Sequence, residues 1–243
     1  MKIDELEQQL GYTFDDRSLL VRALTHRSWA EEAVAEQAGH QHHNERLEFL
    51  GDMVIGLGVT ELLCQSFLTA PEGVLSRTRA KMVGTSCLAV LGAQQGLGEH
   101  LRLGRGEEQM GGRTKQRLLA NCLEAVAGAV FEDGGYAAAQ RLVRQLFAPL
   151  VAEARDVGLD HYGVDPKNLL QHRAHARWAV NPRYVINKEE GPAHEPMFTA
   201  EVILDDHLRA TGEPAPRKQD AGRSAARAAL RAMDALTAES GEE

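Results

Sequence analysis

The chain has 243 residues, with 27 Lys and Arg against 35 Asp and Glu, which gives a formal net charge of −8 at pH 7. This length fits one or two domains, and a hydrophobic content of 43% is enough for a packed core. No apolar run reaches the roughly 18 residues of a membrane span, which excludes an integral membrane protein built on apolar helices. The acidic balance disfavours a nucleic-acid partner unless basic residues gather in local patches.

The cysteines and the first residues of the chain indicate the cellular compartment of the protein. Cys64, Cys87 and Cys122 are odd in number and far apart, which predicts reduced thiols and not a disulfide framework or a zinc site. The first ten residues, MKIDELEQQL, are acidic and lack an apolar core, so we expect no secretion signal. Together these features predict a cytoplasmic protein with no membrane partner.

Residues 1–150 are expected to form a mostly helical domain. Apolar residues recur at helical spacing in five segments, at residues 15–26, 46–68, 75–96, 116–135 and 137–154. Glycines at positions 96, 98, 134 and 135 mark the ends of these segments. The acidic range 151–165 is predicted to be a linker, because it contains glycines and ends at Asp165-Pro166, a pair typical of a helix start.

Three carboxylates share one face of the second helical segment. Glu45, Glu48 and Asp52 stand at i, i+3 and i+7, within about 60° of one another on a helical wheel. Like charges at this spacing repel, and no Lys or Arg follows four residues later. Two interpretations are open, a solvated acidic face and one half of a divalent-cation site. The opposite side of this segment is apolar and carries Leu47, Leu50, Val54 and Leu57, and Asn44 is the expected N-cap.

A later helix offers two more oxygen ligands. Asn121 and Glu124 stand at i and i+3, hence on one face. The small residues 127–129 follow, and they allow another helix to approach closely. Taken singly, Glu124 could equally be a partly exposed helix acid, and Glu72 is more simply explained as an acid at a helix N-terminus.

In residues 166–237 the pattern of apolar residues indicates strands as well as helices. A helix predicted over residues 166–179 is followed by strand-like runs at 183–190, 197–205 and 207–213 and by an alanine-rich helix at 221–236. The order α-β-β-β-α predicts a small α+β domain with its helices on one face of the sheet. Residues 238–243 are predicted to be an acidic tail.

Several sequence motifs resemble those of a known family. NERLEFLGD (44–52) is similar to the signature of the ribonuclease III family, and PEGVLSRTRAKMV (71–83), LGEHLRLGRGE (97–107) and LEAVAGAVFEDGG (123–135) follow in the order of its nuclease domain. The C-terminal unit resembles a double-stranded-RNA-binding domain. The resemblance covers about residues 5–235 and implies an all-α nuclease domain over 1–150, an α+β RNA-binding domain over 166–237, and a homodimer.

The resemblance also implies an activity and its residues. It implies a Mg²⁺-dependent endoribonuclease that hydrolyses double-stranded RNA to 5′-phosphate and 3′-hydroxyl ends with short 3′ overhangs, processing ribosomal and other structured precursors. Mn²⁺ is expected to substitute for Mg²⁺, and no small-molecule cofactor is expected. The implied metal ligands are Glu48, Asp52, Asn121 and Glu124. The implied catalytic residues are Asp52, Glu124, Glu45 and Glu72, the last two in a valley near the dimer interface. Leu47, Phe49 and Leu50 are assigned to core or dimer packing.

Position 121 departs from the family pattern, in which aspartate is usual. An amide oxygen can ligate Mg²⁺, but it brings no charge. Three interpretations are therefore open: a site that works with a neutral ligand, a weakened site that needs more metal, and a catalytically impaired duplex-RNA-binding or ribosome-associated protein that retains the fold. The presence of Glu48, Asp52 and Glu124 favours an active enzyme.

The resemblance places RNA contacts on three parts of the C-terminal domain. They are Gln171 and His175 on the first helix, His194 in the first loop, and Arg217, Lys218 and Arg223 at the start of the last helix. The last cluster is diluted by Gln219 and Asp220, yet residues 217–231 hold five basic residues against one acid. Two basic runs of the nuclease domain, residues 76–81 and 111–117, are candidate contacts to the duplex backbone, although such runs are more often plain surface.

Overall fold

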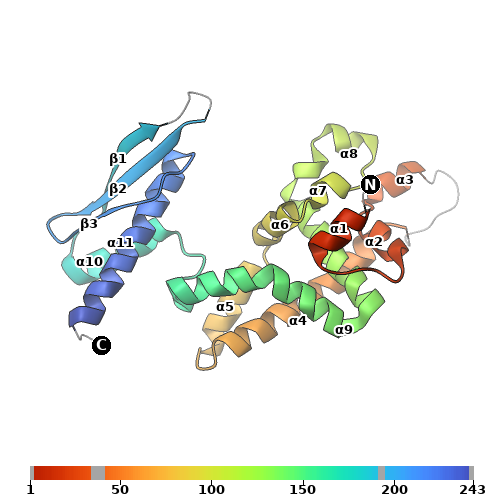
Figure 1. The fold of residues 1–243 in the computed structure, drawn as a ribbon, viewed down its shortest axis with the longest axis horizontal. Coiled ribbons are helices and arrows are strands. Elements are labelled where there is room, and N and C mark those ends of the chain that lie inside the picture. Colours follow the sequence, from red (N-terminus) through yellow and green to blue (C-terminus); the bar gives the residue numbers. More distant parts are fainter. Residues whose placement is uncertain (1–2, 34–41, 191–194, 241–243) are drawn as a thin grey trace. The chain divides into compact units, whose positions relative to one another are not determined.

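The computed structural model describes residues 3–33, 42–190 and 195–240 (Figure 1). The chain divides into two compact units, Met1–Tyr162 and Gly163–Glu243. None of the helices in these described ranges is long and apolar enough to cross a membrane.

The first unit is all-helical, as predicted. Two short 3₁₀ turns, Gly112–Thr114 and Leu159–His161, accompany its helices. The helices are α1 (Ile3–Leu10), α2 (Arg17–Ala23), α3 (Arg27–Ala33), α4 (Glu45–Ser66), α5 (Glu72–Met82), α6 (Thr85–Gln94), α7 (Leu97–His100), α8 (Arg105–Gln109) and α9 (Gln116–Val157). The predicted segment 75–96 is split into α5 and α6 at Val83-Gly84, where the extended backbone of Gly84 starts a new helix.

Helix α9 joins the two segments predicted at 116–135 and 137–154. Its backbone leaves helical geometry at Gly135, where φ is 70° and ψ is −174°, a left-handed φ that favours glycine. The kink is held from α4, because the Glu61 carboxylate accepts hydrogen bonds from the Tyr136 hydroxyl and from Gln140. The glycine pair therefore ends one helical stretch and lets the next begin in a new direction, so the two predicted segments are confirmed as helices on either side of a kink.

Helices α4 and α9 pack against each other through glycine. A Cβ built on Gly51 would lie 1.7 Å from the backbone oxygen of Glu124, and one built on Gly128 would lie 2.2 Å from the backbone oxygen of Leu47. No side chain larger than hydrogen fits at either position unless the helices separate. The contact fixes the residues next to Gly51 against the α9 turn that contains Glu124.

The N-terminus and the apolar side of α4 agree only in part with what the sequence predicts. The helix begins after Asn44, as predicted, but the Asn44 side chain makes no capping hydrogen bond. Leu47 and Val54 are buried as expected, whereas Leu57 is 51% exposed. Helical spacing predicts the side of α4 on which Leu57 lies, but it does not determine whether another element covers that side.

The range 151–165, predicted as a linker, is largely structured. Helix α9 continues to Val157 because Val151 and Ala154 are buried in the core of the first unit. Tyr162 is also buried there, and its backbone oxygen accepts a hydrogen bond from the Lys81 ammonium. On the other side, the Asp165 side chain caps the next helix by accepting from the Lys167 backbone. The two units therefore meet directly in sequence at Tyr162 and Gly163.

The second unit has the predicted α-β-β-β-α order. It consists of α10 (Pro166–Trp178), β1 (Arg183–Glu190), β2 (Met197–Leu204), β3 (Leu208–Thr211) and α11 (Lys218–Ser240), with an antiparallel sheet in the order β1-β2-β3. Alanines of α11, including Ala221 and Ala225, are fully buried against the sheet in one core with Leu170 of α10. Helix α11 starts before the predicted residue 221 and extends into the predicted tail as far as Ser240; residues 241–243 lie outside the described ranges.

Replacing Gly51 with alanine should destabilise the protein by at least about 3 kcal/mol, because the new methyl group collides with the α9 backbone. Gly56→Ala is the matched control in the same helix, since a Cβ there meets nothing within 4 Å. We expect that variant to gain about 0.5–1 kcal/mol from helix propensity. Denaturant unfolding followed by circular dichroism measures both, and equal stability of the two variants would contradict the close packing.

Candidate active site

The packing of α4 on α9 brings together most of the residues singled out in the sequence. Glu45, Glu48 and Asp52 project from the first two turns of α4, and Asn121 and Glu124 project from α9. Glu48, Asn121 and Glu124 are half-buried, whereas Glu45 and Asp52 are exposed. The cluster of these five side chains, here called the acidic cluster, therefore has a buried inner part and a solvent-facing rim.

The electrostatics of the acidic cluster confirm that its members face one another. Desolvation, followed by the charges of Asp52 and Glu48, raises the pKa of Glu124 to about 7. Desolvation and the charge of Glu45 also raise the pKa of Glu48. The Asn121 amide donates toward the Glu48 carboxylate and opposes that rise in pKa. Ionising the whole cluster is thus unfavourable in the absence of a cation.

A cavity of about 260 Å³ opens beside the acidic cluster. It is lined by His26, Arg27, Asn44, Glu45, Glu48, Leu101, Glu107, Arg117, Leu118 and Asn121. Glu45 on its rim is 3.4 Å from Arg27 and 3.8 Å from His43. The lining of the cavity thus combines the carboxylates of Glu45, Glu48 and Glu107 with the guanidinium groups of Arg27 and Arg117.

The acidic cluster fits a hard divalent cation by chemistry. Its donors are carboxylate and amide oxygens, the ligands that Mg²⁺ prefers, and a bound cation would relieve the repulsion that raises the pKa of Glu48 and Glu124. The side chains do not yet converge on one point, because no group of three or more His, Cys, Asp or Glu among the described residues is arranged to hold a metal ion.

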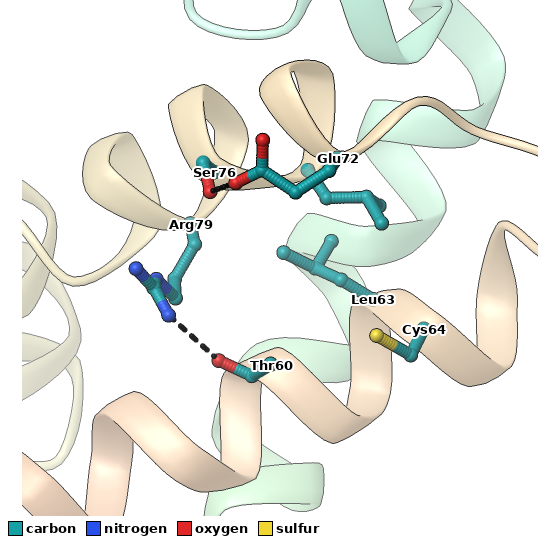
Figure 2. Close-up of a pocket in the computed structure, with 7 residues that line it drawn as sticks. Thr60, Leu63, Cys64, Glu72, Ser76 and Arg79 are labelled. Atoms are coloured by element: carbon teal, nitrogen blue, oxygen red, sulfur yellow. Dashed lines mark hydrogen bonds between the residues drawn. The ribbon is translucent and has the colours of Figure 1, made fainter.

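Glu72 lies apart from this cluster within one chain. It begins α5, where its carboxylate accepts a 2.6 Å hydrogen bond from Ser76, and it lines a separate cavity between α4 and α5 (Figure 2). In that cavity Arg79 donates to Thr60 at 3.3 Å, and Cys64 lies on the same side as Thr60. A catalytic role for Glu72 is not supported by proximity to the acidic cluster and stays a prediction.

The predicted RNA contacts fall into three situations. Gln171 and His175 are exposed on α10 and line a shallow cavity of about 400 Å³. Arg217 and Lys218 are exposed at the start of α11, with the Lys218 ammonium 5.1 Å from the centre of the Phe198 ring. His194 lies outside the described residues.

Arg223 has a structural function that the sequence did not reveal. Its guanidinium is 2.9 Å from Asp165, the N-cap of α10, and 3.2 Å from Asp220. This ion pair raises the pKa of Arg223 and joins the starts of the two helices of the second unit. The prediction that Arg223 contacts RNA is untested, but its donors are already engaged inside the chain.

Sequence analysis did not place Arg117 in the active site. Arg117 belongs to the basic run 111–117, which was treated as a backbone contact or plain surface, yet it lines the cavity with Glu48 and Asn121. It precedes Asn121 by four residues on α9, so helical spacing alone could have placed it on the ligand face.

Comparison with known proteins gives matches over both units. Residues 16–150 match the family model described as Ribonuclease-III-like, and residues 166–233 match the double-stranded RNA binding motif. A "Ribonuclease 3" of Geobacter metallireducens is 44% identical over 93% of this chain and 89% of its own length, and one of Roseiflexus sp. is 42% identical over 97% of each.

Two solved structures of the ribonuclease III nuclease domain of Campylobacter jejuni are also similar. The first shares 37% identity with a TM-score of 0.55 and covers 61% of this chain and 96% of its own. The second, also 37% identical, has a TM-score of 0.53, covers 60% of this chain and 99% of its own, and was described for flexibility in a region involved in dimer formation.

The raised pKa of Glu124 predicts how metal-free stability depends on pH. The folded protein keeps this proton up to about pH 7, whereas the unfolded chain releases it near the ordinary value of 4.5. Stability should therefore fall as the pH rises from about 4.5 to about 7. In EDTA, the melting temperature of Glu124→Gln should exceed that of the wild type more at about pH 8 than at about pH 5. The exposed Glu99→Gln is the control, and a pH-independent difference for Glu124→Gln would contradict the assignment.

Proposed function

The chain belongs to the ribonuclease III family, and we propose that it is a Mg²⁺-dependent endoribonuclease of double-stranded RNA. The endoribonuclease activity follows from the family, because two relatives named Ribonuclease 3 match nearly the whole chain. The observation that carries the mechanism is the acidic cluster, in which desolvation and the charges of Asp52 and Glu48 on α4 raise the pKa of Glu124 across the helix contact.

We assign the metal to Glu48, Asp52, Asn121 and Glu124. A bound Mg²⁺ supplies Lewis-acid polarisation of the phosphate and lowers the pKa of a coordinated water. The chain's own contribution is a set of oxygen ligands held in place by the glycine contact. Glu124, with a pKa of about 7 in the metal-free protein, is partly protonated near neutral pH and releases that proton when a cation binds.

The hydrolysis that we propose balances without any other reactant. A water oxygen forms a bond to phosphorus, the bond from phosphorus to the 3′ oxygen breaks, and the water proton reaches the leaving oxygen through solvent. The products are a 5′-phosphate and a 3′-hydroxyl. Glu45 is proposed to act at the rim of the site, where it is exposed and its carboxylate is 3.4 Å from the Arg27 guanidinium. The catalytic role of Glu72 is proposed from the family resemblance alone.

We propose that two copies of the chain associate through α4. Phe49, Met53 and Leu57 follow one another at i, i+4 and i+8, and they are 80%, 62% and 51% exposed. An apolar stripe of this kind on a helix surface fits a second copy of the same helix. The similar Campylobacter jejuni nuclease domain was described with a region involved in dimer formation. Two sites related by a two-fold axis would cut both strands and leave the 3′ overhangs.

The second unit is proposed to hold the duplex. Duplex RNA is recognised mainly by shape through 2′-hydroxyl and phosphate contacts. Exposed Gln171 and His175 on α10 and exposed Arg217 and Lys218 at the start of α11 supply donors for such contacts. The natural substrates proposed are structured precursors, ribosomal RNA among them, met in the cytoplasm.

The test is incubation of the purified protein with long duplex RNA, with and without Mg²⁺, followed by gel analysis. We expect cleavage only with a divalent cation, and a loss of about 100-fold or more in Glu124→Gln. That variant should bind duplex RNA as the wild type does, because the RNA-binding unit has its own core. Single-stranded RNA of the same sequence is the control substrate.

Two outcomes of this test would contradict the proposal. Absence of cleavage by the wild type at every Mg²⁺ and Mn²⁺ concentration would favour a catalytically impaired duplex-RNA binder. Equal loss of binding and cleavage in Glu124→Gln would mean that Glu124 supports the fold and not the reaction.

Asn121→Asp should move half-maximal cleavage to a several-fold lower Mg²⁺ concentration, because affinity for a hard cation rises with ligand charge. The same change replaces an amide that donates toward Glu48 with a repelling carboxylate, so the metal-free protein should melt at a lower temperature. Asn121→Ala is the matched control, and it should raise the Mg²⁺ requirement. An unchanged requirement in both variants would mean that side chain 121 does not reach the metal.

A further inference from the structure

The basic run 111–117 contains three cations in very different situations. The Arg113 guanidinium is paired with Glu108 at 2.7 Å and also donates to the backbone oxygens of Gly98 and Leu101. The Lys115 ammonium is 2.5 Å from Glu107. These two side chains hold the loop before α9 in place, which leaves Arg117 as the member of the run whose donors no described residue uses.

The other basic groups of the cavity beside the acidic cluster are also engaged. Arg27 is 3.4 Å from both Glu45 and Glu31. His26 bonds Ser28 through Nδ1 at 2.8 Å, and desolvation lowers its pKa, so it is neutral at neutral pH. Arg117 makes no hydrogen bond and no ion pair with any residue that the structure describes. Among the basic residues that line this cavity, Arg117 is therefore the charged one whose N–H donors no described residue uses.

The position of Arg117 on α9 aligns it with the metal ligands. Arg117, Asn121 and Glu124 stand at i, i+4 and i+7 on the face of α9 that meets α4. Arg117 and Asn121 line one cavity with Glu48, and the positive charge of Arg117 lowers the pKa of that carboxyl. The guanidinium is therefore next to the proposed metal site, on the side where Asn121 contributes no negative charge.

We propose that Arg117 is a substrate-binding residue of the cleavage site, whose guanidinium binds a phosphate of the RNA strand next to the proposed metal ligands. This inference rests on the proposed function. A guanidinium presents a planar fork of donors that matches two phosphate oxygens, and it stays charged at any pH at which RNA is stable. A cation on one side of the phosphate and the metal on the other share the negative charge that develops during hydrolysis.

Arg117 could instead affect the site only by repelling the metal cation, but this is the weaker explanation of its position. Arg117 is exposed, and between exposed charges water reduces the interaction to about 1 kcal/mol at 4 Å. A direct charge-assisted hydrogen bond to phosphate outweighs that effect. The two explanations also predict opposite responses to Mg²⁺, which makes them separable.

The test compares wild type, Arg117→Ala, Arg117→Lys and the control Arg141→Ala in the full-length chain. Arg141 is exposed on the same helix beyond the kink at Gly135. Single-turnover cleavage of a defined duplex RNA is measured against Mg²⁺ concentration. We expect Arg117→Ala to lower the maximal rate by about 10- to 100-fold. Added Mg²⁺ should not restore that rate, and lysine should restore part of it because it keeps the charge without the fork.

A second measurement does not depend on cleavage. In EDTA, the affinity for the same duplex is measured against salt concentration, and loss of one phosphate contact should reduce the slope of log K against log salt by about one. Arg141→Ala should leave the slope unchanged.

The inference would be overturned by an unchanged maximal rate in Arg117→Ala, by recovery of that rate at high Mg²⁺, or by an unchanged salt slope. Any of these results with an active wild type leaves the proposed function intact. An inactive wild type removes the proposed function itself.

Discussion

The close contact between Gly51 and the α9 backbone is the constraint on which the site depends. Gly51 immediately precedes Asp52 and follows Glu48 by three residues, while its nearest neighbour across the contact is the carbonyl of Glu124. Because neither helix carries a side chain at the crossing, acids from two distant parts of the chain meet in a partly desolvated place. Desolvation at this contact, together with the charges of Asp52 and Glu48 across it, raises the pKa of Glu124.

Negative charge is distributed unevenly between the two helices that form the acidic cluster. The α4 side carries Glu45, Glu48 and Asp52, whereas the α9 side offers a neutral amide at Asn121 with the positive Arg117 one turn before it. Negative potential therefore falls off toward the N-terminus of α9. A metal is favoured by the α4 side, and an anionic ligand such as phosphate is favoured by the cavity on the Arg117 side.

Cleavage and duplex binding are assigned to units that are structurally independent. Each has its own core, and the chain is tied to the first unit as far as Tyr162 and to the second from Asp165 onward. The net charge of −8 is compatible with RNA binding because the exposed start of α11 is locally basic, with Arg217 and Lys218. Local charge governs phosphate binding within the short range that salt screening allows.

The sequence by itself determined the helical and α-β-β-β-α units, the approximate positions of the strands and the identity of most of the acidic cluster, because periodicity and side-chain chemistry are local properties. Only the tertiary structure decided that the two helical stretches of α9 meet at a kink without an intervening loop, that Leu57 is exposed, and that the expected linker is largely structured. It also separated Glu72 from the cluster, engaged Arg223 in an ion pair, and left Arg117 with unused donors. The reason is that partners and burial depend on which distant segments meet, and helical spacing fixes the face of a residue without fixing what that face contacts.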